Sequence, residues 1–285
     1  MTYSGLSIHT PLDKTLGTSN QQLHYIELGS GPPLLLIHGL FDSLESWQKL
    51  IPLLSDHFKI YAIDLPGFGK SPLPTSWTRS IYGMIQSAVA FLEEKEGRPV
   101  SLLGNSMGGG IALGIAEALP ERIDRIVLLN PYGLPSLPIA AKGAQGRIRG
   151  RILPYLLRPS ALRRCAKGIL KRSLYNPDLV SGPMIERVIQ PFSSIQQRKN
   201  LFRFLKGISS EEIQSIDDRL PTIAQAVLIL WGEKDGWLSD AHWERLLDRL
   251  RDGKVIKIPD CGHLPHLEKP KEVAEAIIQF LRNTD

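Results

Sequence analysis

A serine flanked by glycines follows an apolar run in residues 102–110, LLGNSMGGG. Where a buried strand turns at once into a helix, the two backbones touch, and a Cβ at Gly104 or Gly108 would collide across the turn. Such a turn strains the residue at its apex and lifts the Ser106 hydroxyl to the amino end of the helix, where negative charge is favoured. The sequence disfavours a phosphate-binding loop, because the segment lacks the lysine of a P-loop and the second glycine spacing of a dinucleotide fingerprint. We therefore interpret Ser106 as a nucleophile.

A serine hydroxyl is a weak nucleophile and needs a base that a carboxylate orients. His263 and His266, in DCGHLPHLEKP, follow the last apolar run, at the sheet edge where a base must lie. We favour His263, which comes directly after Gly262, and interpret His266 as a surface or loop-packing residue. His38, in LIHG, is expected to shape a loop.

The orienting acid is expected after the apolar run in LILWGEKDGWLSD. We choose Asp235, which ends a turn after a buried strand at the same edge as Ser106 and His263. Glu233 is interpreted as a solvated turn residue and Asp240 as a helix cap. Asp64, at another strand end, is expected to brace a loop by accepting backbone N–H bonds.

Acyl transfer also needs N–H donors for the oxyanion of the tetrahedral intermediate. One is expected from the backbone of Met107, directly after the nucleophile. The second is expected from Leu40, with Phe41 as the alternative, because Gly39 lets this loop approach closely. Phe41 and Asn105 are assigned to substrate binding.

The elements that must position these residues follow from the hydrophobic pattern. Val-, Ile- and Leu-rich runs read as strands buried on both faces, at residues 33–39, 59–67, 100–106, 123–131, 226–235 and 254–263. Residues 23–29 alternate and predict an antiparallel strand at one edge. Amphipathic stretches at 44–56, 80–97, 107–120, 240–253 and 270–283 predict helices between them. This α/β alternation predicts a mostly parallel, doubly wound sheet.

The charge distribution divides the chain. Residues 142–206 carry 15 Lys and Arg but only Asp178 and Glu186 as acids, whereas the whole chain has a net charge of +5. We interpret residues 135–215, called the insert below, as a basic helical lid over the sheet, and residues 1–134 and 216–285 as the core domain. Its cations have three interpretations: a solvated face, a surface that docks on an anionic membrane, or arginines that hold an acidic substrate group.

Composition limits the class of protein. No apolar stretch reaches the length of a membrane span, and MTYSGLSIHT lacks the features of a signal peptide. Cys165 and Cys261 lie far apart and outside any metal-ligand spacing. We expect a cytoplasmic protein without a metal and without nucleic acid as a partner; the oligomeric state is left open.

These motifs together resemble the α/β-hydrolase superfamily from about residue 20 to the end of the chain. HGLFDSLESW, DLPGFGKS, GNSMGG, WGEKD and GHLPHLEKP occur in the superfamily's order, with Ser, Asp and His in its chain order. The resemblance implies an α/β-hydrolase fold with a lid after the sixth strand, a Ser106–His263–Asp235 triad and no cofactor.

Within this superfamily, Ser106 speaks against dehalogenases and epoxide hydrolases, which need a carboxylate nucleophile. GNSMGG is similar to the elbow of the meta-cleavage-product hydrolases, which break C–C bonds, but those enzymes usually have Trp where this chain has Leu264. We therefore expect a carboxylesterase or lipase-like enzyme with a small-molecule ester substrate. C–C bond hydrolysis and a non-catalytic, ligand-binding member of the fold are the alternatives.

Overall fold

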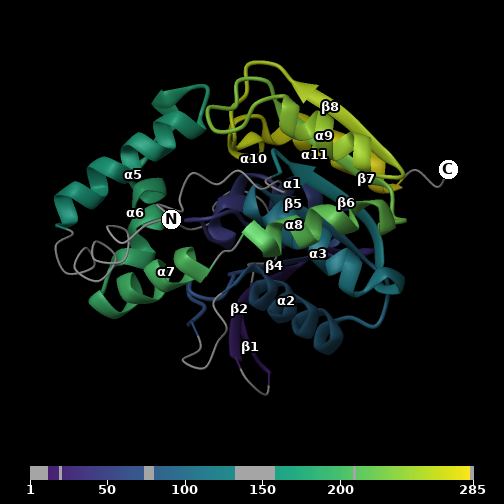
Figure 1. Cartoon of the computed structure of the whole chain (residues 1–285), viewed down its shortest axis with the longest axis horizontal. Coiled ribbons are helices and arrows are strands. Elements are labelled where there is room, and N and C mark those ends of the chain that lie inside the picture. Colours follow the sequence, from purple (N-terminus) through teal and green to yellow (C-terminus); the bar gives the residue numbers. More distant parts are fainter. Residues whose placement is uncertain (1–11, 19–20, 74–79, 132–157, 208–209, 283–285) are drawn as a thin grey trace.

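The computed structural model describes residues 12–18, 21–73, 80–131, 158–207 and 210–282. Its strands form one eight-stranded sheet in the order β1-β2-β4-β3-β5-β6-β7-β8 (Figure 1). β1 and β2 pair antiparallel, and β2 pairs antiparallel with β4; all pairs from β4 to β8 are parallel. The predicted mostly parallel sheet is confirmed. The strands are β1 Leu12–Thr18, β2 Gln21–Leu28, β3 Pro33–Ile37, β4 Lys59–Ile63, β5 Val100–Asn105, β6 Ile123–Leu129, β7 Val227–Gly232 and β8 Gly253–Ile258.

One prediction at the edge of the sheet is wrong. Residues 23–29 were expected to form the antiparallel edge strand, and β2 is indeed antiparallel. β1 covers it, however, pairing from Leu12 opposite Glu27 to Thr18 opposite Gln21. The segment LDKTLGT of β1 has only weak apolar alternation, so its partner in the hairpin, and not its own pattern, makes it a strand.

Helices cover both faces of the sheet because each central strand is apolar on both faces; every residue of β3 and β5 is buried. Side chains of α2, α3 and α8 belong to the core cluster on one face, and those of α1 and α11 to the cluster on the other. These elements are η1 Leu44–Lys49, α1 Ile51–Leu54, α2 Ile81–Lys95, α3 Met107–Ala118, η2 Pro120–Arg122, α8 Ser210–Arg219, η5 Leu220–Thr222, α9 Ala241–Arg249, α10 Pro265–Glu268 and α11 Pro270–Arg282.

The described part of the insert is helical and stands beside the strands (Figure 1). Apolar residues of α5 and α6 form a cluster with Phe41, Leu264 and Leu267, which follow the carboxyl ends of β3 and β8. Residues 135–157 of the insert lie outside the described residues. The predicted boundary at 215 falls inside α8, whose Ile216 packs in the core cluster. The elements are α5 Pro159–Ser173, η3 Pro177–Leu179, α6 Gly182–Ile189, η4 Gln190–Phe192 and α7 Ile195–Gly207.

Candidate active site

Ser106 occupies the turn between β5 and α3, with φ 52° and ψ −119°. This is a conformation that non-glycine residues rarely adopt. The flanking glycines make the turn possible. A Cβ on Gly104 would lie 2.3 Å from the carbonyl oxygen of Gly108, and one on Gly108 would lie 2.1 Å from that of Ile37. The geometry is that of the strand–turn–helix elbow expected from the sequence.

Ser106, His263 and Asp235 form a continuous hydrogen-bonded chain. The Nε2 atom of His263 lies 2.9 Å from Oγ of Ser106, and Nδ1 lies 2.7 Å from Oδ2 of Asp235. The three residues come from the carboxyl ends of β5, β8 and β7, which meet at one edge of the sheet. The imidazole is therefore placed to take the serine proton while the carboxylate fixes its tautomer.

The Asp235 carboxylate is held by four donors. Nδ1 of His263 and Nδ2 of Asn130 donate to Oδ2, the latter at 2.8 Å, and the backbone N–H groups of Trp237 and Leu238 donate to Oδ1 at 2.7 and 3.1 Å. Burial alone would raise the pKa of Asp235, but the hydrogen bond and charge of His263, together with the two N–H groups, outweigh it and lower that pKa. The acid is thus kept ionised.

Asn130 is a site residue that the sequence analysis missed. It follows β6 with φ 40°, is fully buried, and uses both ends of its carboxamide: Nδ2 donates to Asp235 and Oδ1 accepts from N–H of Gly232. It positions the acid from the neighbouring strand. The available signal was a polar residue at the end of the apolar run IVLLN.

The predicted oxyanion donors lie on both sides of Ser106. Met107 is the first residue of α3, so its N–H has no partner within the helix. Leu40 and Phe41 lie in the turn after β3, where Phe41 has φ 61°. A Cβ on Gly39 would lie 3.2 Å from that of Ser106, so this turn runs close beside the serine.

Asn105 lies elsewhere than predicted. The residue is 1% exposed, and its Nδ2 donates to the carbonyl oxygens of Leu129 (3.0 Å) and His263 (3.2 Å). Because its amide group is hydrogen-bonded to two backbone carbonyl groups, Asn105 holds the backbone of His263 in place and does not face a substrate. Phe41 does reach toward the insert, with its ring 5.8 Å from that of Phe192.

The other candidate residues have structural roles. Nε2 of His38 accepts from N–H of Leu65, and Asp64 accepts from N–H of Leu44 and Lys70, as expected of loop-bracing residues. His266 is fully buried with its ring 4.5 Å from that of Trp47, so of the two predicted places it packs and is not on the surface. Burial, together with the charge of Arg187, lowers the pKa of His266 to about 3.

The end of α5 docks directly on the loops that carry the candidate base and acid. N–H of His263 donates to the carbonyl oxygen of Ser173 at 2.7 Å, and Nε1 of Trp237 donates to Oγ of Ser173. The guanidinium of Arg172 lies over the Trp237 ring, and its Nε donates to the carbonyl oxygen of Gly236. The insert thus braces the site from outside.

A second insert arginine is buried against the turn after β3. Arg187 of α6 is 8% exposed, and its Nε lies 3.2 Å from Oδ1 of Asp42. On the same helix, Met184 and Val188 pack in the cluster that contains Phe41 and Leu264. The charge of Arg187 is therefore already paired at the edge of the site.

Comparisons with known proteins decide the family. Residues 34–276 match the model of the "Alpha/beta hydrolase family". The chain belongs to the alpha/beta hydrolase family. It is 28% identical over 252 residues to an uncharacterized hydrolase, YugF, of Bacillus subtilis (87% of this chain, 89% of that protein). It is 26% identical over 269 residues to a 2-hydroxy-6-oxo-6-phenylhexa-2,4-dienoate hydrolase of Comamonas testosteroni (91% of each).

A solved structure shows the same fold. An alpha/beta hydrolase fold protein from Burkholderia ambifaria superposes with a TM-score of 0.80 at 23% identity, over 95% of this chain and 99% of that one. The predicted fold is thus confirmed, and the chain is a hydrolase of that fold. Among the described residues, no helix has the length and apolar character of a membrane span, and no group of three His, Cys, Asp or Glu residues could hold a metal.

Proposed function

We propose that this alpha/beta hydrolase cleaves an uncharged carboxylic ester through an acyl-enzyme on Ser106. The observation that carries the proposal is the chain of contacts from Ser106 Oγ through His263 to Asp235, with 2.9 and 2.7 Å between the partners. These are the distances at which a base can accept a proton from a nucleophile while a carboxylate orients it.

In the proposed reaction, Oγ of Ser106 attacks the ester carbonyl carbon as Nε2 of His263 takes its proton. The oxyanion accepts hydrogen bonds from N–H of Met107 and from N–H of Leu40 or Phe41. The intermediate collapses, and His263 returns the proton to the departing alcohol. The same histidine then activates water, which releases the acid and restores Ser106.

C–C bond hydrolysis is the second candidate, supported by the similarity to the Comamonas testosteroni enzyme, whose named substrate is a dienoate and therefore a carboxylate. An enzyme for such a substrate benefits from a free cation at its site. Arg187 is the described insert cation that is buried beside the turn after β3, and Asp42 already pairs with it. This pairing favours an uncharged ester.

Labelling with a fluorophosphonate tests whether Ser106 is the nucleophile. A panel of esters graded by acyl length, with a dienone acid alongside, tests which type of bond is cleaved. We expect one label, on Ser106, and turnover of uncharged esters well above that of the acid. Absence of both labelling and turnover would favour the ligand-binding alternative. Faster turnover of the dienone acid would overturn the ester proposal and leave the nucleophile intact.

A further inference from the structure

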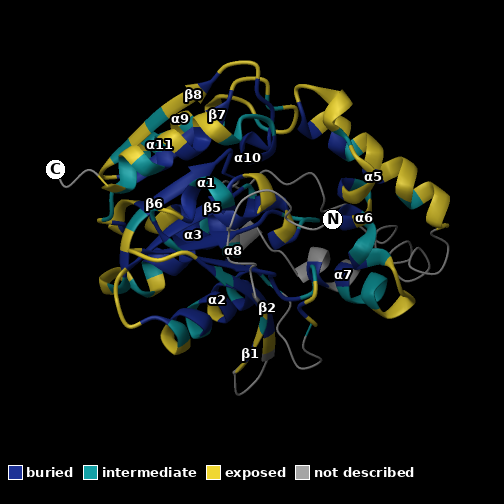
Figure 2. Ribbon diagram, turned by 180° about the vertical axis from the view of Figure 1, so that it is seen from behind, coloured by how far each residue is buried: buried dark blue, intermediate teal, exposed yellow. Residues whose placement is uncertain are grey.

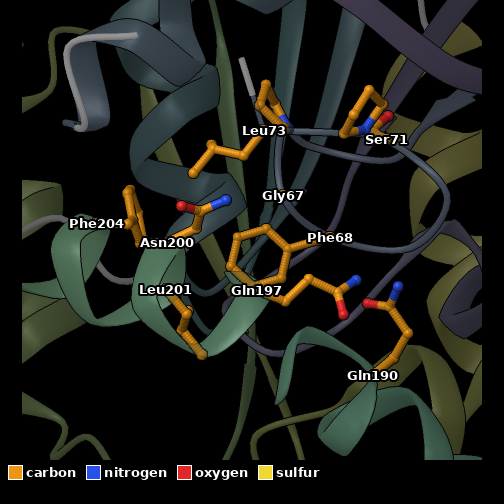
Figure 3. Close-up of a pocket in the computed structure, with 11 residues that line it drawn as sticks. Gly67, Phe68, Ser71, Leu73, Gln190, Gln197, Asn200, Leu201 and Phe204 are labelled. Carbon is orange, nitrogen blue, oxygen red and sulfur yellow. The ribbon is translucent and has the colours of Figure 1, made fainter. Parts of the chain in front are cut away.

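A pocket of about 240 Å³ lies between the loop that follows β4 and helix α7 of the insert. Its lining does not include Ser106, His263 or Asp235. Figure 3 shows the ring of Phe68 within it, with the carboxamides of Gln190 and Gln197 pointing toward one another on one side of the ring. The lining residues are Pro66, Gly67, Phe68, Ser71, Pro72, Leu73, Gln190, Gln197, Asn200, Leu201 and Phe204.

The polar lining is uncharged and rich in carboxamides, so we call this the carboxamide pocket. None of its lining residues carries a charge. A charged ligand would lose its hydration here without meeting a counter-charge. The free-energy cost of this desolvation exceeds what hydrogen bonds from uncharged side chains can offset. Phe68 and Phe204, with rings 6.2 Å apart and nearly perpendicular, supply apolar walls. The ligand is therefore uncharged and partly apolar.

Gln190 presents an acceptor without a donor. Its Nε2 donates to the carbonyl oxygen of Gly69 at 2.7 Å, which fixes the orientation of the amide, because a carbonyl oxygen can only accept. Its Oε1 is buried and has no hydrogen-bond partner in the described part of the chain. Such an oxygen is costly unless a bound group donates to it.

Gln197 and Asn200 present the opposite character. Oε1 of Gln197 accepts from Oγ of Ser193 and from N–H of Ser194, and Oδ1 of Asn200 accepts from Gln196. In the bonds formed among the described residues, their amide N–H groups remain available as donors. A hydroxyl group is the smallest uncharged group that both donates, to Gln190, and accepts, from Gln197 or Asn200.

The walls of this pocket also touch the loop beside the nucleophile. The Phe68 ring lies 5.7 Å from that of His38, which precedes Gly39. Phe192, two residues after Gln190, contacts Phe41 with rings 5.8 Å apart. These two ring contacts join the walls of the carboxamide pocket to the turn that carries the candidate oxyanion donors.

We propose that the carboxamide pocket binds an uncharged hydroxyl group at the far end of the ester substrate. This inference rests on the proposed ester hydrolysis and adds a substrate class, hydroxyl-terminated esters. The hydroxyl can belong to the alcohol half or to the acyl half, and both place the same group beside Gln190.

Two matched series of esters test the proposal. One pairs ω-hydroxyalkyl butyrates with alkyl butyrates, and the other pairs methyl ω-hydroxyalkanoates with methyl alkanoates, each over increasing chain length. We expect kcat/KM to favour the hydroxyl member about five-fold at one chain length in one series, because a methyl group there leaves the Gln190 oxygen unpaired. The series that shows this maximum identifies the half of the substrate that enters.

Gln190→Leu, Gln197→Leu and Asn200→Leu should each bring this preference close to one while hydrolysis of p-nitrophenyl butyrate persists. Gln279→Leu is the matched control, since this exposed glutamine is on α11 and does not line the pocket. Turnover without a hydroxyl preference at any length, or a preference that all three variants keep, overturns the pocket proposal alone. If the wild type turns over none of these esters, p-nitrophenyl butyrate included, the proposed function is overturned as well.

Discussion

The sheet edge around Ser106 and helix α5 of the insert are built in opposite ways. At the sheet edge, Asp235 has four hydrogen-bond donors, and the glycines flanking Ser106 leave no room for a methyl group. On α5, most residues are exposed (Figure 2), and a Cβ on Gly168 would meet nothing within 4 Å. Tight packing is thus concentrated where reacting atoms must be held within tenths of an ångström.

The two regions meet at the last turn of α5. Ser173 accepts the N–H of His263, and Arg172 covers Trp237, next to the loop of Asp235. Among the described contacts, the other cations of α5 do not touch the loops that carry His263 and Asp235. One end of this helix therefore belongs functionally to the sheet edge, and the rest can vary more freely.

The largest expected effect is on the sheet edge itself. Ser106→Ala and His263→Ala should each lower kcat by about 10⁴- to 10⁶-fold with little change in the melting temperature, because members of such a triad act as a unit. His266→Ala is the control: it should lower stability through the lost Trp47 contact yet keep turnover per folded molecule. If His266→Ala is folded but inactive and His263→Ala is active, the base is His266 and the assignment to His263 is wrong.

The sequence predicted the positions of Ser106, His263 and Asp235 because all three follow apolar strands, and the carboxyl ends of parallel strands share an edge. The fold followed from the same alternation. Asn130 could not be assigned from the pattern alone, because its role depends on β6 lying next to β7 in the sheet. The spacing of polar residues along the chain does not reveal which strands are neighbours in the sheet.

Long-range pairs were also beyond the sequence pattern. The contact between Asp42 and Arg187 joins the turn after β3 to α6, and no local periodicity links them. His266 was expected on the surface or packed in a loop, and only the position of Trp47 in three dimensions decides between the two. The basic character of α5 was evident, but which cation docks on the core was not.

Glycine substitutions in the two regions should have opposite signs. Gly108→Ala should lower the free energy of unfolding by about 3 kcal/mol, because its Cβ would meet the carbonyl oxygen of Ile37 at 2.1 Å. Gly168→Ala, inside α5, should raise it by about 0.5–1 kcal/mol, since alanine is the better helix former and has open space. Urea unfolding measures both, and equal effects at the two positions would show that the elbow and α5 are packed equally tightly.

A pH-dependent loss of stability should be traceable to His266. Its pKa is lowered to about 3 in the folded chain, whereas an unfolded histidine binds a proton near pH 6.5. The unfolded state therefore binds more protons between these values, and the free energy of unfolding falls as the pH drops below 6.5, by about 1.4 kcal/mol per pH unit from this group.

His266→Phe isolates that contribution, because it keeps an aromatic ring beside Trp47 without a titratable group. Wild type and variant should differ by a constant amount above pH 7.5, and the variant should gain on wild type progressively down to pH 4. Denaturant unfolding at several pH values measures this difference. Parallel stability curves for the two proteins would show that His266 finds a hydrogen-bond partner when it is protonated.

The smallest effect per residue is expected on the exposed face of α5. Ala166 and Leu170 of this helix are buried in the insert, so its apolar side is not available to enter a membrane. Attraction to an anionic membrane surface would therefore be electrostatic, at roughly 1 kcal/mol for each basic residue near the surface. Arg172 is left unchanged in the test because it docks on Gly236 and Trp237. The variant replaces four other cations with Gln: Arg163, Arg164, Lys167 and Lys171.

Sedimentation with vesicles containing anionic lipid should show binding of the wild type at low salt that weakens steeply as salt is added, because screening shortens the reach of exposed charges. The α5 variant should lose this binding and keep turnover of a small ester. A control variant with the same change in net charge replaces exposed cations of the core with Gln: Lys234, Arg251, Lys254 and Lys271. If both variants bind equally less, net charge and not the position of α5 is responsible. If neither the wild type nor either variant binds, α5 is a solvated face, and its contribution to the enzyme is confined to the turn at Arg172 and Ser173.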